Sequence, residues 1–174
     1  MKNSKLKLGV SIGTAILAFI GALLGTYVSG YMQESLRKID LDNPEDLSLM
    51  QRLYSDRIPI SNCFGIIKET TVATLNLLYM SAYYIESMDC MVIYQIKDET
   101  LYIKDIIATK LCDLDLILNS ISNKFSKVVL QFSPDNFLKI PFNPIAALTD
   151  GCFMISQDFD MKCSSFRYPE TQRC

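Results

Sequence analysis

The chain has 174 residues, enough for one domain and an appendage, and its 17 Lys and Arg against 19 Asp and Glu leave a formal net charge of −2. A charge so close to balance excludes a dedicated nucleic-acid-binding protein, which would carry a basic face. The sequence contains no His, which excludes a His-dependent triad, an imidazole general base and a His-ligated zinc site within the chain.

The first element expected is a single transmembrane helix over residues 8–32, an uncharged stretch of 25 residues after a basic flank at residues 1–7. About 20 helical residues are enough to cross a bilayer. A cleaved signal peptide is the rival interpretation, with Val28-Ser29-Gly30 resembling a cleavage site. Its apolar region would span only about 7–15 residues, so an uncleaved membrane anchor is favoured.

Small residues recur at four-residue steps along this segment: Gly9, Gly13, Gly21, Gly25 and Ser29. Such steps keep them near one helix face and allow a second backbone to approach closely. The pattern predicts a homo-oligomer or a partner membrane helix. The alternative is that glycine is simply common in membrane helices, and the pattern does not decide between the two.

Six cysteines are present, none in a CxxC pair, so no metal site is expected: Cys63, Cys90, Cys112, Cys152, Cys163 and Cys174. An even count permits disulfides in an exported domain. Four of them stand beside apolar residues, which favours buried thiols in a reducing compartment. Three lysines before the anchor against two positive residues just after it favour a domain outside the cytoplasm instead.

Residues 33–56 are expected to form a linker and a short helix, with Asn43 as the N-cap and Pro44 in the first helical position. Residues 57–174 are expected to form a mixed α/β domain. It begins with a strand at residues 63–68, and the ambiguous run at residues 71–80 is taken as a strand rather than a helix.

The clearest pattern is a hairpin of strands at residues 91–97 and 100–107, joined by Asp98-Glu99. A helix capped by Asp113 follows, with an apolar face at Leu114, Ile117, Leu118 and Ile121. Further strands are expected at residues 127–132 and 152–156. The fold class predicted is therefore a mixed sheet with flanking helices, preceded by the transmembrane helix.

Candidate chemistry is sparse. Asp105, within a strand, is the carboxylate most suited to orient a ligand, although a solvent-facing or sheet-edge position is the more frequent role. Asp113 and Asp115 are explained by helix capping, and a lone Lys110 by solvation. An aromatic group is expected to be core rather than a ligand pocket: Tyr79, Met80, Tyr83 and Tyr84. Cys174 has no partner base, so no catalytic residue is assigned.

Several ordered segments between residues 57 and 174 resemble the C-terminal part of bacterial GNAT-superfamily acyltransferases: "YYIESMDCMVIYQIKDETLYIKDII", "DLDLILNSI", "KVVLQFSPD" and "DGCFMISQDFDMKCSSFRYPETQRC". The resemblance implies a partial GNAT-like fold, in which a hairpin is followed by a helix and a strand. The glycine-containing loop that binds acetyl-coenzyme A in that superfamily has no counterpart here, so no cofactor-binding residue is carried over. The resemblance and the thiols together place the domain in the cytoplasm.

These features predict a membrane-anchored, non-catalytic interaction or sensing module, with a degenerate GNAT-like domain and a self-associating helix. No cofactor is expected in that case. One alternative is an N-acyltransferase that uses acetyl-coenzyme A in a divergent site or in a site completed by a partner chain. Another is an exported domain that contains disulfides.

Overall fold

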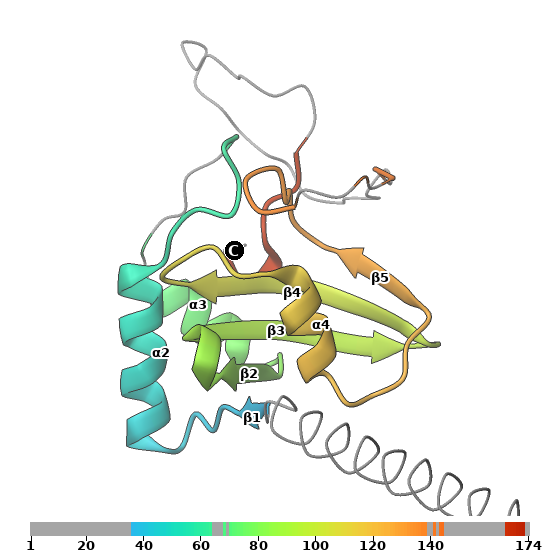
Figure 1. The fold of residues 1–174 in the computed structure, drawn as a ribbon. Helices are drawn as coiled ribbons and strands as arrows, with labels where there is room; N and C mark the ends of the chain where they lie inside the picture. Colours follow the sequence, from blue (N-terminus) through green and yellow to red (C-terminus); the bar gives the residue numbers. More distant parts are fainter. Residues whose placement is uncertain are drawn as a thin grey trace, which may run out of the picture. The chain divides into compact units, whose positions relative to one another are not determined.

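The computed structural model describes residues 36–63, 68, 70–138, 141, 143–144 and 166–172. These residues fold as a mixed α/β domain around a five-stranded sheet (Figure 1). In chain order the elements are β1 (Arg37–Lys38), α2 (Pro44–Asp56), α3 (Thr70–Leu77), β2 (Ala82–Ile85), the 3-10 helix η1 (Glu86–Met88), β3 (Cys90–Lys97), β4 (Thr100–Ala108), α4 (Leu114–Ser120), β5 (Lys127–Leu130) and the 3-10 helix η2 (Glu170–Gln172). The predicted mixed sheet with flanking helices is confirmed for this part of the chain.

The sheet has the strand order β1-β2-β3-β4-β5. The pairs from β1 to β4 are antiparallel, whereas β5 lies parallel to β4. A parallel neighbour requires a crossover connection, and α4 supplies it. The carboxyl end of β4 therefore leads directly into α4.

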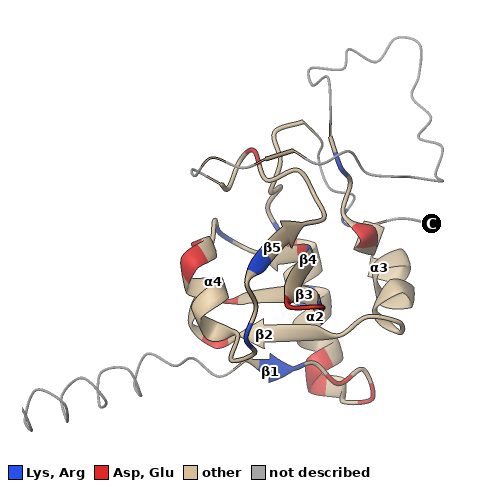
Figure 2. Cartoon of the chain, turned by 90° about the vertical axis from the view of Figure 1, so that its right-hand side faces the viewer, with Lys and Arg blue, Asp and Glu red and all other residues tan. Residues whose placement is uncertain are grey.

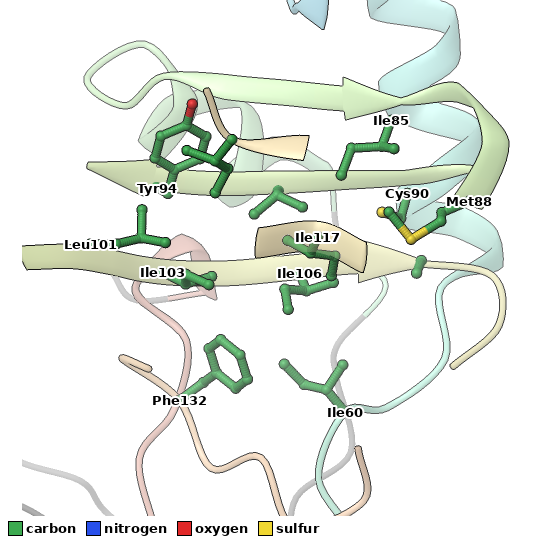
Figure 3. Close-up of a cluster of buried hydrophobic side chains, with 13 residues drawn as sticks. Ile60, Ile85, Met88, Cys90, Tyr94, Leu101, Ile103, Ile106, Ile117 and Phe132 are labelled. Atoms are coloured by element: carbon green, nitrogen blue, oxygen red, sulfur yellow. The ribbon is translucent and has the colours of Figure 1, made fainter. Parts of the chain in front are cut away.

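Helices cover both faces of the sheet and create two hydrophobic cores (Figure 1). The α2-side core, which includes α3, contains Ile39, Met50, Leu53, Tyr54, Ala73, Leu77, Ala82, Met91, Ile93 and Ile107. The α4-side core contains Ile60, Ile85, Met88, Cys90, Val92, Tyr94, Leu101, Ile103, Ile106, Ala108, Ile117, Ile121 and Phe132 (Figure 3). Alternate residues of β3 enter opposite cores, as the two-residue period of a strand requires.

The hairpin predicted at residues 91–107 is confirmed as β3 and β4. Its turn residues, Asp98 and Glu99, have φ values of 49° and 56°. A two-residue type I′ turn requires positive φ at both central positions, because its twist then matches that of the strands. The Glu99 carbonyl also accepts a 2.8 Å hydrogen bond from the Ser126 backbone N–H, at the start of β5.

A β-bulge in β4 changes which residues face which core. Ile93 pairs with Asp105, but Tyr94 pairs with Ile103, so Lys104 is an extra residue in β4. On the α4 side, β4 accordingly contributes Leu101 and Ile103 before the bulge and Ile106 and Ala108 after it. A bulge re-aims the side chains around it. Here it turns Asp105 away from the α4-side core.

Both helices with a predicted N-cap are confirmed. The Asn43 side chain accepts a 2.9 Å hydrogen bond from the Glu45 N–H at the start of α2, and Asp113 accepts the equivalent bond from Asp115 at the start of α4. These bonds satisfy N–H groups that have no acceptor within the helix. The strand predicted at residues 127–132 is also confirmed, as the shorter β5.

The strand expected at residues 71–80 is wrong, because this segment begins as α3 and ends in a turn. Ala73 and Leu77, four positions apart, lie on one helix face and are buried against the sheet. This packing outweighs the strand preference of the neighbouring Thr71 and Val72. The strand next to β3 is formed instead by β2, which the sequence did not predict as a strand, and β1 was also missed.

No helix among the described residues is long and apolar enough to cross a membrane. The predicted transmembrane helix at residues 8–32 lies outside the described residues, with its packing positions Gly9, Gly13, Gly21, Gly25 and Ser29. The same holds for the strand predicted at residues 152–156, for Cys174 and for most of the strand predicted at residues 63–68.

Candidate functional site

The carboxyl end of β4 and the start of β3 carry a group of polar side chains and thiols. Asp89 connects η1 to β3 with φ of 45°, a left-handed conformation that Asp tolerates better than most residues. Its carboxylate accepts two hydrogen bonds from Arg52, at 2.6 and 2.9 Å, and one from the Tyr84 hydroxyl at 2.8 Å. The Thr109 hydroxyl lies 3.4 Å from the same carboxylate.

The hydrogen bonds from Arg52 hold the pKa of Asp89 at about 2, and the Tyr84 and Thr109 hydroxyls act in the same direction against burial. The carboxylate is therefore ionised throughout the physiological pH range. Arg52 neutralises it and the surrounding hydroxyls saturate it, so Asp89 is poorly suited to accept a proton from a substrate.

Two thiols lie immediately beside this carboxylate. Cys90 is the first residue of β3 and a fully buried member of the α4-side core. Cys112 is half-buried and packs against that core. The hydrogen bond that Cys90 donates to the Cys112 sulfur lowers the pKa of Cys112, and the charge of Lys110 lowers it further against the effect of burial. Figure 3 shows the sulfur of Cys90 next to that of Met88 at one end of the α4-side core.

The connection from β4 to α4 does not fit the pyrophosphate of acetyl-coenzyme A. Phosphate binding at such a junction uses unpaired backbone N–H groups at a helix start and a loop whose backbone can approach closely. Here the Asp113 carboxylate already accepts the Asp115 N–H, and the start of α4 is acidic (red in Figure 2), which disfavours a phosphate. Asp113 thus caps the helix, as the sequence predicts, and Asp115 is an acidic residue of its first turn.

Asp105 has a different role from either one expected. It is fully buried and accepts two hydrogen bonds from the equally buried Arg57, at 2.9 and 3.2 Å. It also accepts bonds from the Thr171 hydroxyl in η2 and from the backbone N–H of Ile106, the latter at 2.8 Å. This cluster connects the end of α2 with β4 and η2. Because an unpaired buried charge is strongly unfavourable, the three segments are held together at this point. Its burial leaves no access for a substrate.

Tyr54 borders this cluster, with its ring 5.5 Å from the Arg57 guanidinium carbon. Burial, and then the charge of Asp105, raise the pKa of Tyr54, so its hydroxyl stays protonated. The cluster is thus structural, and sequence reasoning missed it because Arg57 follows a helix and its partner lies far along the chain. The signal available in the sequence was the position of Asp105 in a strand rich in isoleucine, which indicates burial.

The aromatic group expected to form core is divided. Tyr79 is 89% exposed and lines two open surface grooves, of about 670 and 350 Å³. Tyr83 stacks on Tyr94 with 4.6 Å between ring centroids, whereas Tyr84 turns to Asp89. Both grooves are shallow, and their titratable side chains are Lys38, Asp40 and Tyr79 in the first and Lys104 with Tyr79, Tyr83 and Tyr94 in the second. They therefore do not define an active site.

The cysteines fall into two states. Cys63 is disulfide-bonded, so the expectation of a buried thiol is wrong at this position. Cys90 and Cys112 are thiols, as expected. Cys152, Cys163 and Cys174 lie outside the described residues. Within the described part of the chain, no group of three or more His, Cys, Asp or Glu residues is arranged to bind a metal ion.

Comparison with protein-family models, with curated proteins and with solved structures gives no match in any of the three. The candidate site must therefore be judged on its own geometry. That geometry comprises a neutralised carboxylate, a half-buried thiol with a second thiol behind it, and a helix start that is already capped.

Proposed function

We propose that the chain is a membrane-anchored, non-catalytic interaction or sensing module with a degenerate GNAT-like domain. The observation that carries this proposal is the capped, acidic β4–α4 junction, where the Asp113 carboxylate accepts the Asp115 N–H and two acidic residues stand at the start of α4. The order of the hairpin, α4 and β5 supports the GNAT-like part, because the sequence resemblance implies the same order.

An acetyl-coenzyme A titration of the full-length chain in mild detergent tests the non-catalytic character. We expect a flat isotherm and no acetyl transfer. Saturable binding would instead support the acyltransferase alternative, if it persists in Asp113→Asn and weakens when a basic residue outside this junction is replaced. A site completed by a partner chain is tested by repeating the titration with a membrane extract added.

Membrane anchoring is supported by the uncharged segment at residues 8–32, which ends a few residues before β1. We expect the full-length chain to remain in the membrane pellet after alkaline carbonate extraction. Arginine near the centre of the segment costs about 2.5–3.5 kcal/mol per residue on insertion, so Leu17→Arg with Ile20→Arg should release the chain. A wild-type chain that is extracted as readily as this variant contradicts the anchor.

Self-association through the small-residue face is tested by cross-linking in membranes. Gly21→Leu with Gly25→Leu should reduce the cross-linked dimer, because larger side chains separate the two backbones. Ala15→Leu with Thr26→Leu adds bulk roughly 80° or more around the helix from Gly21 and Gly25 and serves as the matched control. Equal loss in both variants means that the Gly face has no specific role.

The disulfide at Cys63 favours a second candidate, a domain on the oxidising side of the membrane. Structural disulfides persist in exported proteins and are rare in the cytoplasm. The excess of lysines before the anchor favours the same orientation. Protease treatment of intact cells distinguishes the two: a domain digested from outside is exported, and a protected domain that is digested only after lysis is cytoplasmic.

A further inference from the structure

The hairpin register brings Cys90 and Cys112 together at one end of the sheet. Cys90 pairs with Ala108, the last residue of β4, and the chain then turns so that Cys112 packs against the core to which Cys90 belongs. The Cys112 thiol donates to the carbonyl of Lys110 at 3.5 Å, and it accepts a hydrogen bond from the Cys90 thiol. The two thiols are thus hydrogen-bonded neighbours although 22 positions separate them in the sequence.

The two thiols differ in accessibility. Cys112 is half-buried. The hydrogen bond from Cys90 and the positive charge of the exposed Lys110 favour its thiolate form and outweigh its burial and the charge of Asp89. Cys90 is fully buried, so a reagent from solution meets Cys112 first. An accessible thiol with a lowered pKa and a second thiol behind it is the arrangement that thiol–disulfide exchange requires.

We propose that Cys90 and Cys112 form a thiol–disulfide exchange site whose substrates are small-molecule disulfides. The Cys112 thiolate attacks one sulfur of the disulfide, which forms a mixed disulfide and releases one thiolate that takes up a proton. The Cys90 thiol then loses its proton and attacks the Cys112 sulfur, which releases the second thiol. Overall, the protein dithiol and one disulfide give a protein disulfide and two thiols, with two electrons passed from protein to reagent.

Closure of this bond has a structural consequence near α4. Disulfide sulfurs lie about 2 Å apart, closer than two hydrogen-bonded thiols, so the loop that carries Cys112 must move toward β3. The next residue is Asp113, the N-cap of α4. Oxidation therefore shifts the start of α4 and the carboxylates exposed there. This site does not depend on membrane attachment, so it goes beyond the function proposed above.

The test uses the full-length chain in mild detergent, equilibrated with reduced glutathione and then exposed to glutathione disulfide at neutral pH. At successive times the remaining thiols are alkylated and peptides containing Cys90 and Cys112 are analysed by mass spectrometry. We expect both thiols to disappear together, with a peptide pair linked by loss of two hydrogens and little glutathione adduct. The Cys63 disulfide should remain intact throughout, because a structural disulfide resists the glutathione pool.

Two variants separate the roles of the thiols. Cys90→Ala should accumulate a glutathione adduct at Cys112, because no second thiol is present to release it. Cys112→Ser should leave Cys90 as a thiol over the same period, because the accessible nucleophile is absent. If Cys90→Ala does not fold, the wild-type time course still decides the question.

The proposal is overturned if the wild-type chain accumulates a stable adduct at Cys112 while Cys90 remains a thiol. It is also overturned if neither thiol reacts in the folded chain although both are alkylated after denaturation. Because the reaction is measured in detergent, these outcomes are independent of whether the chain is membrane-anchored, which the carbonate extraction tests in cells.

Discussion

The domain contains the same ion pair in two environments. Arg57 and Asp105 form two hydrogen bonds with both side chains 0% exposed. Arg52 and Asp89 also form two, but with the side chains 44% and 32% exposed. The pairing geometry is alike, so burial decides what each pair does. Loss of either member of the buried pair leaves an unpaired charge in the core, so the stability of the fold depends on both. The exposed pair contributes little to stability, and its charges lie beside the Cys112 thiol.

The largest expected effect comes from breaking the buried pair. Asp105→Ala leaves Arg57 charged and unpaired in the core, which we expect to lower the free energy of unfolding by about 3–5 kcal/mol. The measurement is denaturant unfolding of the full-length chain in mild detergent. Asp89→Asn removes the exposed charge while tolerating the same left-handed backbone, and it should cost about 1 kcal/mol or less.

Replacing both members of the buried pair sharpens this contrast. Arg57→Met with Asp105→Leu fills a similar volume without charge, and such replacements are often neutral or stabilising. We expect the double variant to be clearly more stable than Asp105→Ala. If the two are equally unstable, lost packing rather than an unpaired charge explains the effect.

Two threonine hydroxyl groups contact the two carboxylates, Thr171 at Asp105 and Thr109 at Asp89, and their removal should have smaller effects on stability. Thr171→Val removes a hydrogen bond to buried Asp105 and should cost about 1.5–3 kcal/mol, as for other bonds to charged groups. Thr109→Val removes the 3.4 Å contact to Asp89 and should cost about 0.5 kcal/mol or less. Limited proteolysis should also cut near residue 171 faster in the first variant only. Equal stability changes would mean that burial does not separate the two sites.

The acid stability of the exposed pair depends on the lowered pKa of Asp89. Its carboxyl has a pKa of about 2 in the folded chain, mainly because of the Arg52 hydrogen bonds, against about 3.9 when unfolded. A lowered pKa contributes stability above the unfolded value, and this contribution is lost as the pH falls toward 2. We expect Asp89→Asn to flatten the decline in stability between about pH 4 and pH 2. An unchanged pH profile would show that other carboxylates dominate.

The smallest effect concerns the thiol beside the exposed pair. Lys110→Gln removes a positive charge near Cys112 and should raise the pKa of its thiol, since that charge favours the thiolate. The rate of alkylation at Cys112, followed against pH, should shift upward with little change in stability. Lys124→Gln alters an exposed lysine elsewhere and is the control. A shift of the same size in both variants would rule out a local effect of Lys110.

The sequence was informative where the determinants are local. The Asp98-Glu99 turn and the Asn43 and Asp113 caps depend on residues within a few positions, and all three are confirmed. The segment that forms α3 was taken as a strand because its own residues permit both structures and only contact with the sheet decides. The ion pair of Arg57 with Asp105 spans 48 positions, and no local pattern indicates it.

The proximity of Cys90 and Cys112 belongs to the same class of long-range features. Each cysteine stands beside apolar residues, which correctly indicates a thiol in or near the core. Their contact depends on the pairing of β3 with β4 and on the turn after Ala108. A sequence pattern predicts the hairpin, because its register is set by the turn and by the buried faces. It does not predict the turn after Ala108 that brings Cys112 to Cys90.

The two-residue turn between β3 and β4 also bears on the order of folding. Closing so short a loop costs little entropy, and hairpins form within about 1–10 μs in isolated peptides. The Glu99 carbonyl in this turn then accepts the Ser126 N–H, which positions the start of β5 across a much longer connection. We expect the hairpin to be largely formed in the folding transition state and β5 to dock afterwards. Substitutions in the turn should accordingly change the folding rate, and substitutions in β5 the rate of unfolding.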